Sequence, residues 1–177
     1  VLCWEEGSNL PRVVPAVFIE RNGQTYARAY SLSNSVYAVV SGSKTFADMQ
    51  SHWAKTEVEM LASKMILNGR SSSEFDPNGT TTRAEFAAML TRALGLTDQA
   101  ESAVHFGDIN GQEWYAGSIG AAVKEKIVNG MADGTFKPQQ NISRQEAVVM
   151  LVNARQLTGE KTGLAAAEKD QIQIGRA

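Results

Sequence analysis

The sequence predicts a mainly α-helical protein built from tandem helix-loop-helix repeats and preceded by a short β-strand segment. The segment "TTRAEFAAML" at residues 81–90 returns as "ISRQEAVVML" at residues 142–151. From residue 46 onward, apolar residues recur at three- and four-residue spacing, which is typical of amphipathic helices. Residues 13–41 instead contain many β-branched and aromatic residues around the turn signal Asn22-Gly23, and we expect three short strands there.

Composition restricts the classes of function. Of the 177 residues, 43% are hydrophobic and 20% are charged, as in ordinary soluble proteins, and the net charge is −2. We therefore expect no binding of nucleic acid, and the absence of an 18-residue apolar run predicts no membrane insertion. Cys3 is the only cysteine, so an internal disulfide is excluded, and we expect neither a metal nor a cofactor. The sequence indicates no role for Cys3.

The chain divides into four segments. Residues 1–44 form the β-rich segment, expected to be the end of an upstream domain or a linker, because three strands alone make a weak sheet. The first repeat is expected at residues 45–97 and the second at residues 105–158. Residues 159–177 have the composition of a connector towards a further repeat, which this sequence does not contain.

The two repeats match in fixed order with one inserted residue. Because a lone helix pair cannot bury its apolar faces, we expect the copies to pack on one another. The matching pairs are Phe46 with Phe106, Asp48 with Asp108, Trp53 with Trp114, Asn68-Gly69 with Asn129-Gly130, Phe75 with Phe136, Pro77 with Pro138, Arg83 with Arg144, and Met89-Leu90 with Met150-Leu151.

Each second helix opens with a predicted capping box. Thr82 or Ser143 is the expected N-cap, and Glu85 or Glu146 is expected to reach back to it. The box does not explain the arginine that follows each N-cap, since a cation at the first helical position opposes the helix dipole. Beside free N–H groups a guanidinium makes a receptor for a carboxylate or phosphate, which we favour. The alternative is an internal ion pair with Asp48 or Asp108.

These motifs resemble the S-layer homology repeat. The resemblance covers residues 46 to about 157 and rests on Phe-x-Asp, the Trp at the first helix, Asn-Gly, "DGTFKP" and the Thr/Ser-Arg-x-Glu box. It implies a pseudo-three-fold helical bundle, here partial, that anchors bacterial surface proteins non-covalently to secondary cell-wall polysaccharide. The expected partner is a glycan with acidic pyruvate ketal groups, and the expected location is the extracellular bacterial cell surface.

The resemblance also implies a ligand site in grooves between repeats. Arg83 and Arg144 would contact the glycan carboxylate. At the repeat starts, Asp48 and Asp108 would accept sugar hydroxyls, and Trp53 and Trp114 would stack on sugar rings. Two alternatives stay open: the tryptophans are core residues, and the aspartates cap the first helices or orient the arginines. The absent third repeat leads us to expect self-association through the interface that it would have covered.

Three other functions fit less well. Aligned as a calcium loop from Asn129, the second repeat has Met131 at position 3 and Gln140 at position 12, where ligands are needed. An enzyme is not expected from this segment because it lacks a nucleophile elbow, a metal motif and a phosphate loop, although a parent polypeptide could carry a hydrolase domain. The strongest alternative is a helical protein–protein interaction module whose arginines form internal ion pairs.

Overall fold

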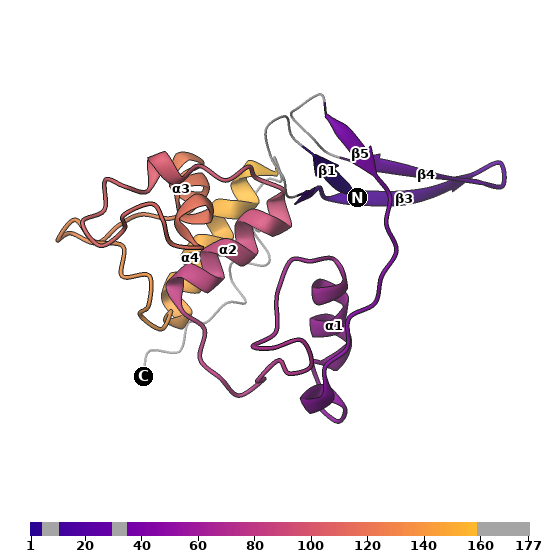
Figure 1. Cartoon of the computed structure of the whole chain (residues 1–177), viewed down its shortest axis with the longest axis horizontal. Helices are drawn as coiled ribbons and strands as arrows, with labels where there is room; N and C mark the ends of the chain where they lie inside the picture. Colours follow the sequence, from indigo (N-terminus) through magenta and orange to yellow (C-terminus); the bar gives the residue numbers. More distant parts are fainter. Residues whose placement is uncertain (5–10, 30–34, 159–177) are drawn as a thin grey trace, which may run out of the picture.

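The computed structural model describes residues 1–4, 11–29 and 35–158 (Figure 1). The expected connector at residues 159–177 lies outside them. The elements in chain order are β1 (Leu2–Trp4), β2 (Arg12–Val13), β3 (Ala16–Arg21), β4 (Gln24–Ala29), β5 (Val36–Ala38), η1 (Ala47–Met49), α1 (Lys55–Ser63), α2 (Arg83–Leu94), η2 (Ala100–Ser102), α3 (Ala116–Lys124) and α4 (Arg144–Leu157). No helix in the described part of the chain is both long and apolar enough to cross a membrane.

The strand segment is larger than expected, which makes the fold mixed α/β rather than clearly mainly α. The described residues contain five strands, and the first begins at Leu2. An antiparallel sheet has the order β2-β1-β5, and a separate hairpin pairs β3 with β4. The hairpin turns at Asn22 and Gly23, both at positive φ, as the Asn-Gly signal predicts. β1 lies outside the residues where strands were predicted, and it hydrogen-bonds to residues 12–13 and 36–38, so its pairing is not visible in local sequence.

Three helices from both repeats form the larger core. α2 packs against α3 and α4, and Figure 1 shows the three side by side, away from α1. The buried members of this core come from α2, α3, α4 and the segments between them: Ala84, Ala87, Leu90, Ala103, Phe106, Ile109, Tyr115, Ala116, Ile119, Ala122, Ile127, Val128, Phe136, Met150 and Ala154. The second helix of the first repeat therefore belongs to the core of the second repeat.

The first helix of the first repeat has a smaller core of its own. Phe46, Met49, Ala62 and Leu67 are buried there, and Phe75 and Met89 pack against them. Met89 comes from α2 and connects that helix to this cluster, and no described residue belongs to both cores. The repeats thus pack on one another, as expected, and they do so because α2 of the first repeat packs into the core of the second.

The sheet lies at the far end of α2. Val14 and Cys3 are buried, and the Arg12 guanidinium donates to the carbonyl of Gly95. Gly95 ends α2 in the left-handed conformation, with φ of 65°, and an added Cβ would lie 2.5 Å from the Pro15 ring. A side chain at this position would therefore strain the helix end and push away the segment that carries the strands.

Candidate functional site

Arg83 is buried at the junction of the two repeats. Its side chain enters the loop and helix start of the second repeat, and the residue is 3% exposed. The guanidinium donates from Nε to the Phe136 carbonyl at 3.0 Å, from Nη1 to Glu146 Oε1 at 2.6 Å and from Nη2 to the Asn129 carbonyl at 3.3 Å. It also lies 4.9 Å from the centre of the Phe136 ring. Each of the three guanidinium nitrogens therefore donates to an acceptor of the second repeat.

The start of α2 offers no free N–H groups to an anion. The N–H of Arg83 donates to the carbonyl of Gln140 at 2.9 Å, and that of Ala84 donates to the carbonyl of Pro138 at 3.1 Å. The N–H of Glu85 donates to the Thr82 hydroxyl in a complete capping box. The expected receptor at Arg83 is therefore closed, because the loop of the second repeat supplies the acceptors that a ligand would have supplied. The ion pair is internal, but its acid is Glu146, not Asp48 or Asp108.

Arg144 has the opposite surroundings. α4 begins with the same capping box, formed by Ser143 and Glu146, but Arg144 is exposed. Within the described residues its guanidinium makes no hydrogen bond or ion pair. Within the described residues, the two arginines of the repeated motif thus differ because Arg83 enters the neighbouring repeat and Arg144 does not.

Asp48 and Asp108 hold loops in place. The Asp48 carboxylate accepts from the N–H of Phe75 at 3.0 Å and of Asp76 at 2.7 Å. Asp108 accepts from the N–H of Phe136 at 2.8 Å and of Lys137 at 2.7 Å. These backbone bonds lower the pKa of Asp48, that from Phe75 first. Neither aspartate caps a first helix, since α1 and α3 have no side-chain cap. The two acids are clamps on equivalent loops.

Both tryptophans at the repeat starts are exposed, which excludes core packing as their role. Trp53 is 88% exposed and Trp114 is 60% exposed. Trp114 stands edge-on to the ring of Tyr115, with ring centres 5.4 Å apart, and Tyr115 is buried. The indole of Trp114 is therefore oriented by a fixed neighbour and is open on another side.

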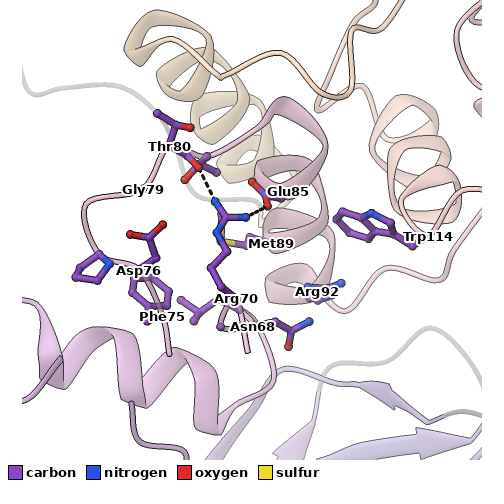
Figure 2. A pocket seen from close by; sticks show the side chains of 14 residues that line it. Asn68, Arg70, Phe75, Asp76, Gly79, Thr80, Glu85, Met89, Arg92 and Trp114 are labelled. Carbon is purple, nitrogen blue, oxygen red and sulfur yellow. Dashed lines mark hydrogen bonds and ion pairs between the residues drawn. The ribbon is translucent and has the colours of Figure 1, made fainter. Parts of the chain in front are cut away.

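A pocket of about 340 Å³ lies between the loop of the first repeat, α2 and Trp114 (Figure 2). It contains one of the expected site residues, Trp114, whereas Arg83, Arg144, Asp48, Trp53 and Asp108 do not line it. The lining residues are Leu67, Asn68, Gly69, Arg70, Phe75, Asp76, Pro77, Gly79, Thr80, Thr81, Glu85, Met89, Arg92 and Trp114.

Two guanidinium groups face this pocket. Arg70 lies in its centre, where it contacts the Glu85 carboxylate and donates to the Thr80 carbonyl at 2.7 Å (Figure 2). Arg92 lies beside Trp114 near the end of α2 (Figure 2). Burial lowers the pKa of Arg92 and the charge of Asp98 raises it, yet an arginine stays charged at neutral pH. A planar anion in the pocket would meet the guanidinium of Arg92, those N–H groups of Arg70 that Glu85 and Thr80 leave over, and an indole face.

Arg70 and Arg92 were missed because comparison of the repeats hides them. The positions 61 residues later hold Met131 and Asn153, so neither arginine belongs to the repeated pattern. The sequence does show this difference: an arginine that occurs in only one repeat indicates a site that the other repeat lacks.

The loop of the second repeat does not form a metal cage. Asp133 accepts from the hydroxyl and the N–H of Thr135 and pairs with Lys137. The bonds from Thr135 lower the pKa of Asp133 from its ordinary 3.8 to about 2. In the described part of the chain, no group of three or more His, Cys, Asp and Glu residues could hold a metal ion.

Comparison with known proteins places both repeats in one family. Residues 45–87 and residues 105–148 each match the model of the S-layer homology domain. The chain contains two S-layer homology domains. Their matched boundaries include both aspartate clamps, both tryptophans and both capping boxes.

The similar proteins are surface-layer proteins and polysaccharide-degrading enzymes. The chain is 39% identical over 124 residues to an amylopullulanase of Thermoanaerobacterium thermosulfurigenes, covering 70% of this chain and 6% of the relative. It is 42% identical over 103 residues to endo-1,4-beta-xylanase A of Thermoanaerobacterium saccharolyticum, covering 58% of this chain and 9% of the relative. It is 31% identical over 139 residues to S-layer protein sap of Bacillus anthracis, covering 78% and 17%. The chain thus spans less than a fifth of the length of each.

Proposed function

We propose that this chain is an anchoring module that binds an anionic cell-wall glycan in the pocket between its S-layer homology domains. The observation that carries the proposal is the meeting of Arg70, Arg92 and the exposed Trp114 around one cavity. The module acts outside the cell, at the bacterial surface, and has no catalytic role of its own. Its relatives include surface-layer proteins and glycan-degrading enzymes, and we propose that the module anchors a protein of one of these two kinds.

The chemistry of the pocket suits a sugar that carries a carboxylate. An arginine fork binds a carboxylate through two parallel hydrogen bonds, and Arg92 is half-buried, where such bonds are less screened by water. Trp114 offers a flat apolar surface for the sugar ring. The carboxylates of Asp76 and Glu85 can accept hydrogen bonds from the hydroxyl groups of the sugar. A pyruvate ketal supplies the carboxylate without a change in the sugar backbone.

The test measures sedimentation of the purified chain with cell-wall sacculi that carry pyruvylated polysaccharide. Arg70→Gln and Arg92→Gln should each weaken binding about tenfold or more, since a hydrogen bond to a charged group contributes roughly 1.5–3 kcal/mol. Trp114→Ala should weaken it through loss of stacking. Arg28→Gln, on the exposed hairpin, is the matched control and should bind like the wild type. Circular dichroism should show equal helix content in all four variants.

Sacculi from which the ketal groups have been removed by mild acid test the carboxylate itself. Binding should be lost with these sacculi. Equal binding to treated and untreated sacculi would refute an anionic ligand, and equal binding of all four variants would refute the pocket. The internal ion pair of Arg83 favours a second candidate, a helical protein-interaction module, which would bind neither kind of sacculi.

A further inference from the structure

The contact between the two repeats is made by one face of α2. The buried residues of this face are Arg83, Ala84, Ala87, Ala88, Leu90 and Thr91. Arg83 bonds to the second repeat, and Ala84, Ala87 and Leu90 belong to its core. The residues 61 positions later on α4 are exposed in every case: Arg144, Gln145, Val148, Val149, Leu151 and Val152. We call these six residues the α4 docking face. Four of them are apolar and between 44% and 56% exposed, which leaves a hydrophobic surface beside an unpaired cation.

The second repeat shows what such a face binds. The Arg83 guanidinium donates hydrogen bonds to the carbonyls of Asn129 and Phe136 and to the carboxylate of Glu146, and it lies over the Phe136 ring. The N–H groups at the start of α2 donate to carbonyls of the second-repeat loop, and the N–H of Ile142 donates to the carbonyl of Thr81. A docking face therefore needs an Asn-Gly loop, a following Phe and the glutamate of a capping box.

The first repeat has all of these groups, and no helix of a neighbouring repeat covers them in the described part of the chain. Asn68, Phe75 and Glu85 are the counterparts of the three receiving residues, and all three line the pocket in Figure 2. We call them the first-repeat receptor. Glu85 is a cap that already pairs with a guanidinium, that of Arg70. Arg70, which has Met131 at the equivalent position of the second repeat, thus pairs with Glu85 as Arg83 pairs with Glu146.

We propose that a second copy of this chain places its α4 docking face on the first-repeat receptor, with Arg144 taking the place of Arg70 beside Glu85. Val148 and Val149 then meet α1, as α2 meets α3 within one chain. On α1, Val58 and Leu61 correspond to the buried Ile119 and Ala122 of α3 and are only partly buried. The contact joins two different surfaces, so it is head to tail and can extend to further copies.

Sedimentation equilibrium and size-exclusion chromatography with light scattering on the full chain test this inference. The wild type should associate as its concentration rises, and Arg144→Glu should raise the dissociation constant at least tenfold, because the new carboxylate meets Glu85. Arg144 is exposed, and an acid at a helix start suits the dipole, so this variant keeps its fold. Arg28→Glu on the hairpin makes the same charge change outside both surfaces and should associate like the wild type.

A second variant separates head-to-tail contact from symmetric contact. Thr80→Lys places a cation in the first-repeat receptor at an exposed position and should also prevent association. Mixed with Arg144→Glu, it should give dimers and nothing larger, since each variant retains the surface that the other has lost. A wild type that stays monomeric up to about 1 mM would overturn the inference. So would undiminished association of Arg144→Glu, or a mixture of the two variants that stays monomeric.

Discussion

Arg83 and Arg144 show how far identical residues of a repeated motif can differ in their surroundings. Both follow an N-cap and precede a capping glutamate, yet Arg83 is 3% exposed and bonded on three sides while Arg144 is exposed. Removal of Arg83 takes the guanidinium donor away from two carbonyls and from Glu146 Oε1. Arginine at this place is therefore a structural connector in the first repeat.

Arg83→Met should lower the free energy of unfolding by about 3 kcal/mol, the usual cost of breaking a buried ion pair from one side. Arg144→Met makes the same chemical change at the equivalent position and should alter stability by no more than about 0.5 kcal/mol. Urea denaturation followed by circular dichroism measures both, at a protein concentration low enough to keep the chain monomeric. Equal effects of the two substitutions would contradict the structural role of Arg83.

At the scale of the elements, an aspartate clamp shapes the loop before each second helix. Asp48 and Asp108 fix residues 75–76 and 136–137, and Asp76 and Lys137 take the same left-handed conformation, with φ of 63° and 59°. Non-glycine residues adopt this conformation at a cost, so the clamps hold a loop that would otherwise relax. The loops in turn place the carbonyls that receive an arginine.

The clamp at Asp48 should make stability depend on acid pH. Its pKa in the folded protein lies below the ordinary 3.8, so the clamp stabilises the fold above that value and is lost as the pH falls through the lowered pKa. We expect the urea midpoint to fall as the pH drops below about 5 and on through the lowered pKa. It should fall less in Asp48→Asn, whose amide oxygen still accepts a hydrogen bond throughout this range. Glu20→Gln, on the exposed hairpin, serves as control. A pH dependence unchanged in Asp48→Asn would exclude this contribution.

At the scale of the whole molecule, one pocket serves two proposed occupants. The glycan and the Arg144 side chain of a second copy both require the space around Arg70. Their binding is therefore mutually exclusive, and each weakens the other by mass action.

Soluble pyruvylated glycan fragments should shift the associated chain towards the monomer in a concentration-dependent way. Light scattering during a titration measures the shift, and fragments without the ketal provide the control. Association that persists at saturating glycan would place the two ligands in separate sites.

Much of the local structure follows from the sequence alone. The helix starts at Arg83 and Arg144, both capping boxes and the Asn22-Gly23 turn were all predictable, because each depends on residues within four positions of one another. The family was equally readable, since it rests on the order and spacing of motifs along the chain.

The tertiary structure alone decided which side chains are free. An apolar helix face predicts a packing partner but does not identify it. The buried face of α2 packs on the second repeat, whereas the equivalent face of α4 is exposed. The same applies to the charged side chains. The Arg83 guanidinium donates to a loop carbonyl 53 residues away in sequence. Arg70, Arg92 and Trp114 line one pocket only because the chain folds. Burial and partnership are properties of distant segments brought together, and a local pattern does not contain them.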